Sequence, residues 1–152
     1  MRLAALLLLV LLPAQAALGA GGLAHEDVAI TTAAGQTYHF DVEVAASPQE
    51  QERGLMFRGH MAADAGMIFP YDRDTTATFW MHNTLISLDM LFIDGSAHIS
   101  HIAADAVPQS DALIPSGGPI RSVLELNAGT AARLGIHVGD KVAVSAPADS
   151  GK

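Results

Sequence analysis

The chain has 152 residues, of which 50% are hydrophobic, and it carries a formal net charge of −8 with no cysteine. The acidic balance disfavours nucleic acid and anionic lipid surfaces as partners, because their phosphate groups repel it. The lack of cysteine excludes disulfides, thiolate catalysis, cysteine-based zinc sites and haem attachment through cysteine.

Residues 1–20 are predicted to be a secretory signal peptide. Arg2 gives a positive start, residues 3–12 form an unbroken run of Leu, Ala and Val, and Ala16 and Ala20 offer two cleavage points. The apolar run is shorter than the roughly 18–20 residues that a membrane-spanning helix needs. We therefore predict an exported protein, periplasmic or extracellular, with no membrane span after cleavage.

The first half of the remaining chain alternates in the manner of β-strands. A β-prone stretch at 28–32, a turn at 33–36 and strict alternation at 37–45 predict a hairpin. A capped helix start follows at 47–50, where Ser47 and Glu50 are spaced as a capping box and Pro48 suits the first helical position. Gly54 is expected to end or bend this helix. A brief strand at 67–69 is expected to end at Pro70.

The second half is predicted to contain further short strands. We expect strands at 75–81, 88–93 and 97–102, the last two joined by the turn signal Asp94-Gly95. Residues 106–119 are rich in Pro, Ser and Gly, which predicts a long surface loop.

The C-terminal part completes the predicted domain. A strand at 121–126, a short helix at 129–134 that Gly135 stops, and a last strand at 141–144 are expected. The tail 145–152 is predicted to be disordered. The whole pattern predicts one mainly-β domain over residues 26–144, a β-sandwich, jelly-roll-like or barrel-like sheet with two short helices.

Several separated blocks carry a resemblance to a known family. They are Glu52-Arg53-Gly54-Leu55-Met56-Phe57-Arg58, Gly66-Met67-Ile68-Phe69, Phe79-Trp80-Met81-His82-Asn83-Thr84, Leu88-Asp89 with Phe92, Val123-Leu124-Glu125-Leu126, Ala128-Gly129, Gly135-Ile136 and Gly139-Asp140. Their order and spacing resemble the bacterial and archaeal "domain of unknown function 192", over about residues 42–144. The resemblance implies an exported single domain with a β-sandwich or jelly-roll-like fold, and it implies no reaction.

Three charged residues stand in apolar surroundings. Arg53 precedes a Gly-Leu-Met-Phe run, Asp89 lies inside an apolar strand, and Glu125 is flanked by two leucines. One interpretation is that they pair with one another or with backbone amides and brace the fold, because buried charges are usually paired. The other is a pocket in which Arg53 holds an anionic ligand and a carboxylate orients it.

The only tryptophan begins a second group of candidate binding residues. Trp80 is followed by His82, Asn83 and Thr84, and an aromatic ring beside three hydrogen-bonding groups suits a sugar or another small polar ligand. The alternative is a core tryptophan followed by a loop in which Asn83 and Thr84 bind backbone groups. Trp80 and His82 are expected on one face if the strand extends that far.

Other chemistries have less support. Internal methionines at positions 56, 61, 67, 81 and 90, two of them adjacent to His60 and His82, allow copper binding, although methionine also fills irregular cores. Asp89 and Glu125 as a catalytic carboxylate pair would need a separation that sequence does not give. The chain has no nucleophile elbow, phosphate-binding loop or zinc-protease motif, and we predict no metal and no cofactor.

We therefore predict a monomeric, exported binding or accessory module of the cell envelope. Its partner is a small molecule or an envelope protein, and its candidate site consists of Arg53, Trp80, His82, Asn83, Thr84, Asp89 and Glu125. The alternatives are an envelope-acting enzyme that uses the same polar cluster, which we favour less, and a structural protein with no pocket. A pocket lined by two or more of the charged candidates favours a binder or an enzyme.

Overall fold

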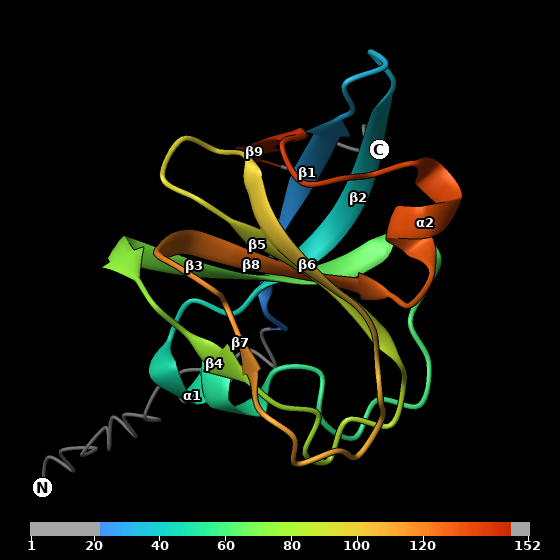
Figure 1. The fold of residues 1–152 in the computed structure, drawn as a ribbon. Helices are drawn as coiled ribbons and strands as arrows, with labels where there is room; N and C mark the ends of the chain where they lie inside the picture. The colour runs from blue at the N-terminus through green and yellow to red at the C-terminus, as the bar shows by residue number, and fades with distance from the viewer. Residues whose placement is uncertain (1–21, 147–152) are drawn as a thin grey trace, which may run out of the picture.

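The computed structural model describes residues 22–146 (Figure 1). The predicted signal peptide, with both of its cleavage points, and nearly all of the predicted tail lie outside these residues. The elements in chain order are β1 (Ala24–Thr31), β2 (Thr37–Val44), α1 (Pro48–Arg53), β3 (Ala65–Thr75), β4 (Thr78–Phe79), β5 (Leu88–Ile93), β6 (Ile99–Ala106), β7 (Ile114–Pro115), β8 (Ile120–Asn127), α2 (Thr130–Leu134) and β9 (Lys141–Ser145).

Seven of the strands form one sheet in the order β6-β5-β8-β3-β2-β1-β9, and β4 pairs only with β7. All neighbours in the large sheet are antiparallel except β2 and β3, which run parallel and are connected through α1. The predicted hairpin at 28–45 is confirmed as β1 and β2. The sheet is not closed into a barrel, although one isolated bridge joins His98, just before β6, to Lys141 at the start of β9.

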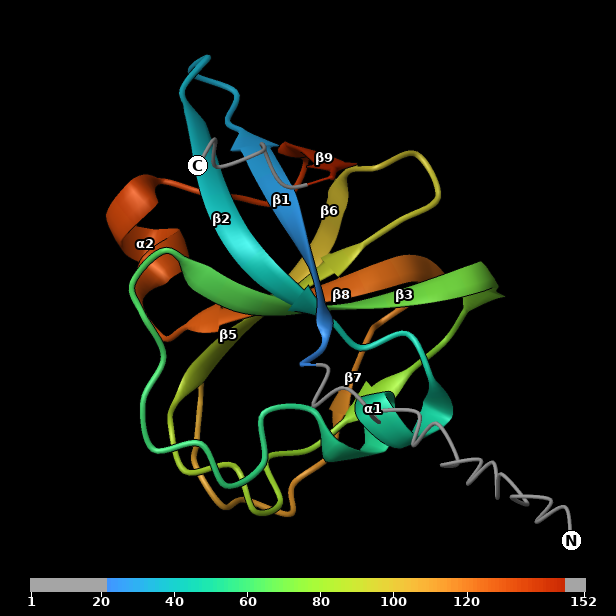
Figure 2. The ribbon, with the colours of Figure 1, turned by 180° about the vertical axis from the view of Figure 1, so that it is seen from behind.

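One core lies between the two halves of the bent sheet. The strands β1, β2 and β9 lie over one face of the strands β5, β8 and β3, as both ribbon views show (Figures 1 and 2). Alternate residues of each strand point into this space, which gives the buried cluster Val28, Ile30, Phe40, Val42, Ile68, Leu91, Ile93, Leu124, Leu126 and Val142. This arrangement is sandwich-like, as the sequence predicted.

A second core covers the opposite face of the central strands. It is formed under α1 and the β4–β7 pair and contains Met67, Phe69, Met81, Leu88, Met90, Phe92, Ile120 and Val123. Because β5 has a core on each side, all six of its residues are buried. A strand buried on both faces reads as a continuous apolar run, which is how 88–93 reads in the sequence.

Both predicted helices are confirmed, with their ends. The Ser47 side chain accepts a hydrogen bond from the Glu50 backbone N–H, and the Glu50 carboxylate accepts one from the Ser47 backbone N–H. The bond from the Ser47 backbone N–H to the carboxylate is the main cause of the lowered pKa of Glu50. Helix α2 ends at Gly135, which adopts a left-handed conformation with φ 67°.

Three predicted boundaries are wrong. Strand β3 does not end at Pro70 but continues to Thr75. Beyond Ile68 it pairs with β8 alone, so its other edge has no neighbouring strand. Proline is tolerated there, because no strand on that edge needs the N–H group that it lacks. The expected strand at 75–81 is reduced to β4, since pairing with β8 ends at Thr75 and residues 78–79 pair with β7 instead. The expected loop at 106–119 contains β7, the partner of β4.

Candidate functional site

A groove lies beside α1, and a narrow notch opens from it. The groove has a volume of about 550 Å³ and is lined by Arg53, Met56 and Phe57 from one side and by Trp80, His82 and Asn83 from the other. The notch, of about 40 Å³, continues inward past Arg53 and Trp80 to Leu55, Phe69, Phe79, Thr84 and Glu125. The two spaces share Glu52, Arg53, Met56 and Trp80, so they form one site with a wide mouth and a narrow end.

Arg53 occupies the mouth of the notch. It is the last residue of α1, and its exposed side chain makes no ion pair or hydrogen bond with any other residue of 22–146. In the structure Arg53 therefore pairs with neither Asp89 nor Glu125, contrary to one of the predicted interpretations. A guanidinium at the rim of a groove is free to bind a planar anion.

Trp80 is a surface residue, so the alternative of a core tryptophan is wrong. It is 47% exposed, because it lies between Phe79 and Met81, whose side chains pack into the core beneath α1 and leave the intervening side chain on the outside. Its ring stacks on His82 with 4.7 Å between ring centroids and an interplanar angle of 22°. The predicted common face of Trp80 and His82 is thus present, although the strand itself does not continue so far.

His82 is held by a residue that the sequence did not suggest. Its Nδ1 lies 2.7 Å from Oδ1 of Asp111, which belongs to the loop between β6 and β7. The carboxylate fixes the imidazole, and the imidazole supports one face of the indole. Asp111 is 29 positions away from His82 in sequence, and no local pattern connects the two.

Asn83 and Thr84 shape the loop, as one of the predicted alternatives stated. Asn83 has φ 55°, which turns the chain, and its carbonyl accepts a hydrogen bond of 2.8 Å from the Phe57 backbone N–H. The Thr84 carbonyl accepts one of 3.0 Å from Gln109. These two bonds connect the segment 79–84 with the loops on either side of it. Asn83 also lines the groove, and Thr84 lines the notch.

Glu125 forms the closed end of the notch. It lies on β8 opposite Met67 of β3 and Met90 of β5, on the face of the sheet that α1 covers. Its side chain is only 5% exposed. Removal from water raises its pKa to about 8, since no charge or hydrogen bond offsets the cost of ionisation. At neutral pH this carboxyl group is therefore mostly protonated.

Asp89 does not belong to this site, and its grouping with Arg53 and Glu125 is wrong. It lies on β5 with its side chain toward α2, on the opposite face of the sheet from Glu125. Its Oδ1 accepts hydrogen bonds from the backbone N–H groups of Asp105 (3.0 Å) and Gly129 (3.2 Å), and its Oδ2 accepts one from Ala131 (2.9 Å). This is the fold-bracing role with backbone amides that one interpretation predicted. It also excludes a paired-carboxylate site of Asp89 and Glu125.

The methionines are mainly core residues. Met67, Met81 and Met90 are at most 1% exposed and lie in the core beneath α1. Their thioethers contact apolar side chains there, which does not favour copper binding. Within residues 22–146, no group of three or more His, Asp or Glu side chains is placed to hold a metal ion.

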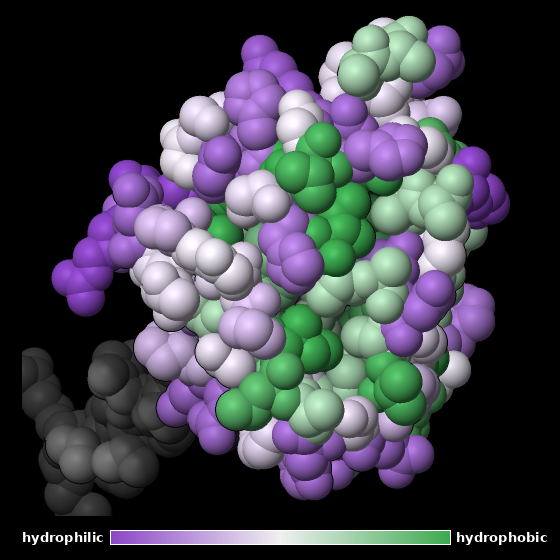
Figure 3. Space-filling model, viewed as in Figure 1, coloured by the Kyte–Doolittle hydropathy of each residue, from purple (hydrophilic) through white to green (hydrophobic). Residues whose placement is uncertain are grey.

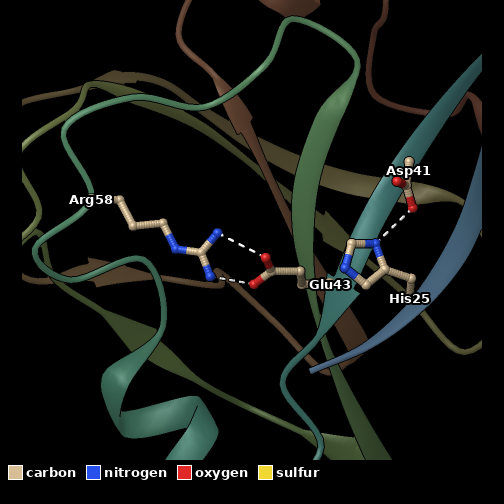
Figure 4. A network of polar contacts seen from close by, with 4 residues as sticks. All are labelled: His25, Asp41, Glu43 and Arg58. Atoms are coloured by element: carbon tan, nitrogen blue, oxygen red, sulfur yellow. Dashed lines mark hydrogen bonds and ion pairs between the residues drawn. The ribbon is translucent and has the colours of Figure 1, made fainter. Parts of the chain in front are cut away.

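The segment after α1 is anchored by an ion pair that the sequence analysis missed. Arg58 Nη1 donates to Oε1 of Glu43 on β2 over 2.9 Å, and Nη2 donates to Oε2 (Figure 4). This two-point contact fixes the loop that carries Met56 and Phe57 along the groove. Phe57 is 60% exposed with φ 64°. An apolar ring held outward in that conformation is consistent with a binding role.

The face of the molecule that carries β6 and β7 is a poorer candidate. There, apolar residues form separate patches among polar ones (Figure 3). A groove of about 290 Å³ runs between β6 and residues 107–114, lined mostly by Ala, Val and Ile side chains with Asp105 as its one charged group. Ligand sites combine apolar walls with several converging polar groups, which this groove lacks.

The fold and the site together define a single mainly-β domain with a polar groove at one end of the sheet. The family model DUF192, described as "Uncharacterized ACR", matches residues 29–144. The chain therefore belongs to the DUF192 family, as the sequence blocks suggested. No curated protein matches the sequence.

Two solved crystal structures are similar to this chain. One is a protein from Sinorhizobium meliloti 1021 described as a "putative transcription regulator", with 44% identity, a TM-score of 0.80 and coverage of 83% of this chain and 98% of that one. The other is a protein of unknown function from Novosphingobium aromaticivorans DSM 12444, with 43% identity, a TM-score of 0.78 and coverage of 82% and 89%. Both support the fold.

Proposed function

We propose that this protein is an exported module that binds a small anionic saccharide in the groove. The observation that carries the proposal is the convergence of six of the seven predicted residues on one groove and notch. The volume of the groove lies within the range of about 300–1,000 Å³ that small-molecule sites occupy. A structural protein with no pocket fits this geometry poorly.

Arg53 supplies the recognition of a negative charge. Since no carboxylate within residues 22–146 pairs with it, its five N–H donors are available to a ligand. A carboxylate accepts two parallel hydrogen bonds from a guanidinium, which fixes its orientation as well as its charge. The anionic group of the ligand is therefore assigned to Arg53.

Trp80 supplies the surface for the ligand's ring. Its large indole is half exposed and immobilised by its stacking on His82, which is in turn bound by Asp111. A fixed aromatic ring offers contact area at a low cost in side-chain entropy. The apolar C–H face of a sugar ring matches such a surface, and the neighbouring Asn83 offers a donor and an acceptor to its hydroxyl groups.

The export part of the proposal is supported by the three-part pattern of residues 1–20. Intact-mass measurement of the protein recovered from the producing cell is its test. We expect the chain to begin at residue 17 or 21 in the periplasm or medium, and a full-length chain in the cytoplasm would contradict export. The description of the S. meliloti protein as a "putative transcription regulator" is not extended to this chain, because a net charge of −8 disfavours nucleic acid as a partner.

Titration with D-glucuronate and D-glucose tests ligand binding. The chain has one tryptophan, so its fluorescence reports on Trp80 alone. We expect glucuronate to change the emission at millimolar concentration and glucose to bind at least tenfold more weakly. The Arg53→Ala variant should remain folded and lose the preference for glucuronate, because Arg53 has no structural partner. Arg73→Ala, which removes an exposed arginine that lines neither the groove nor the notch, is the matched control. No response to either sugar would contradict the proposal.

A second candidate function is catalysis with Glu125 as a general acid. The observation that favours it is the raised pKa of Glu125, at about 8, in a notch that opens to solvent. Its test is the release of reducing ends from purified cell-wall glycan, which the wild type should produce and Glu125→Gln should not. Absence of any product from the wild-type protein would contradict this candidate.

A further inference from the structure

We propose that the notch receives a primary ammonium group and that the ligand is an acidic amino sugar. This inference rests on the proposed function, and it adds the chemistry of the innermost subsite. In the proposed complex the ligand's carboxylate lies on Arg53, its ring lies against Trp80, and its amino group enters the notch to contact Glu125.

Glu125 differs from the other buried carboxyl groups of residues 22–146, because no group donates a hydrogen bond to it. Asp89 accepts three backbone N–H groups, and Asp140 accepts those of Ala33 and His137 at 2.9 and 2.7 Å. Among residues 22–146, no group donates a hydrogen bond to either oxygen of Glu125. A carboxyl group buried to 95% without a partner is costly to the fold, and a bound ligand would supply what is missing.

The Glu125 oxygens face the notch rather than a closed interior. In the described part of the chain, no side-chain oxygen or nitrogen is both sealed from solvent and without a hydrogen bond. Because Glu125 has no bond, its oxygens must contact the accessible space, and the notch is the space that it lines. The missing donors therefore have to come through the notch.

The size and walls of the notch favour an ammonium group. Its volume of about 40 Å³ has room for about one to three water-sized groups, so it admits an amino group and excludes a sugar ring. An ammonium group carries three N–H donors, whereas a hydroxyl group carries one. The ring of Phe79, held edge-to-face against Phe69 at 5.4 Å, lines the same space and can attract a cation.

Among the charged and titratable groups around the notch, Glu125 is the carboxyl group at the inner end, and Glu52 is a second carboxylate at the mouth. Arg53 and Glu52 of α1 stand at its mouth, and His82 lies farther out along the groove. On β3, Tyr71 is near enough that Glu125 adds to the rise in the pKa of its phenol, which burial mainly causes. No other cation reaches the notch from the described elements, so the ammonium group does not compete with a lysine or arginine inside it.

Binding an ammonium group would release a proton. Glu125 is protonated when the notch is empty, because its pKa is about 8. Ion pairing requires the carboxylate, so the acid proton passes to solvent while the ligand keeps its three N–H bonds. The complex then gains one ion pair for each proton released. A hydroxyl group would instead bond to the neutral acid and release nothing.

Calorimetry with muramic acid and N-acetylmuramic acid at pH 6.5 tests this inference. Muramic acid carries a carboxylate and a free amino group on one sugar ring, and acetylation removes the amino charge. We expect muramic acid to bind at least tenfold more tightly and to release close to one proton, measured from the heat in buffers of different ionisation enthalpy. Its affinity should rise roughly tenfold per pH unit between 6 and 7.5.

The Glu125→Gln variant identifies the acceptor. It should release no proton on binding muramic acid, and its affinities for muramic acid and N-acetylmuramic acid should lie within twofold of each other, because the group that distinguishes the two sugars is gone. A circular dichroism spectrum that matches the wild type shows that the variant is folded. Asp72→Asn, an exposed acid on β3, should behave as the wild type in every measurement.

The outcomes separate the two proposals. Equal affinity for muramic acid and its acetylated form, or binding without proton release, would overturn the ammonium subsite and leave the proposed function standing if glucuronate binds. Failure of glucuronate and both muramic acids to bind would overturn both. The comparison of the free and acetylated sugars uses the wild-type protein, so it does not depend on the folding of any variant.

Discussion

Asp89 and Glu125 are carboxylates in otherwise apolar strands, and their environments in the folded protein are opposite. The two oxygens of Asp89 accept hydrogen bonds from three backbone N–H groups, one at the end of β6 and two at the start of α2. Glu125, on the other face of the sheet, has none and ends a notch. The sequence context of the two is alike, and what differs is the face on which each side chain lies.

We expect Asp89→Asn to lower the free energy of unfolding by about 2–3 kcal/mol. Asparagine keeps one oxygen, but its amide N–H₂ then faces a backbone N–H that needs an acceptor, such as that of Ala131. Urea unfolding followed by circular dichroism measures the loss. Asp72→Asn, at an exposed position without such bonds, should change stability by less than about 0.5 kcal/mol. A neutral effect of Asp89→Asn would contradict the bracing role.

Glu125 should make the folded protein less stable as pH rises. Its pKa is about 8 when folded and 4.5 in the unfolded chain, so between these values the folded state holds the extra proton. The contribution of Glu125 to the free energy of unfolding is therefore largest below about pH 4.5. It falls between about pH 4.5 and pH 8 and is constant above about pH 8.

Glu125→Gln removes that dependence. The stability of the variant relative to the wild type should increase by ~1 kcal/mol per pH unit between pH 5 and 7.5. Guanidinium unfolding of both proteins at each pH gives the difference between their free energies of unfolding. The contributions of the histidines and surface acids are the same in both proteins and cancel in this difference. A difference that does not change with pH would show that Glu125 is ionised in the folded protein.

At the scale of elements, the central strands depend on close contact between backbones. Gly66 of β3 lies against β8, where a Cβ atom would stand 2.6 Å from the backbone oxygen of Glu125 and 2.9 Å from Cδ2 of Leu126. No residue other than glycine fits this contact without moving one strand. Both cores share β3 and β8, so a shift there disturbs the packing on both faces.

We therefore expect Gly66→Ala to lower the unfolding free energy by about 3 kcal/mol. Gly59→Ala is the control, since a Cβ at Gly59 meets nothing within 4 Å and its backbone is not in the left-handed region. Thermal unfolding of the two variants and the wild type measures the effect. Similar melting temperatures for all three would mean that β3 and β8 separate easily.

Sequence patterns predicted some of the strands and helices correctly and missed others. Alternation identified β2, and the capping box located α1 at the correct residue, because both signals arise from local geometry. The extent of β3 past Pro70 and the pairing of β4 with β7 were not predicted. Both depend on which strand is available as a neighbour, and this is decided by chain segments far away in sequence.

At the scale of the whole molecule, bending of the sheet creates the two cores and the site. Strands β1, β2 and β9 lie over one face of the central strands, and the opposite face is left to α1 and the β4–β7 pair. The groove forms where the loops after α1 and β4 meet beside the segment that precedes β7. Within residues 22–146, no helix is long and apolar enough to span a membrane.

The sequence alone determined that this is a single mainly-β domain of the DUF192 family, and it identified six residues of the groove and notch. The fold class follows from periodicity and turn signals, and the family follows from the resemblance of the sequence blocks, all of which are read along the chain. Only the tertiary structure decided that Asp89 and Glu125 lie on opposite faces, that Arg53 is unpaired within the described chain, and that Asp111 holds His82. Burial and hydrogen bonding of a charged side chain depend on the elements that pack against it, and these come from distant parts of the chain.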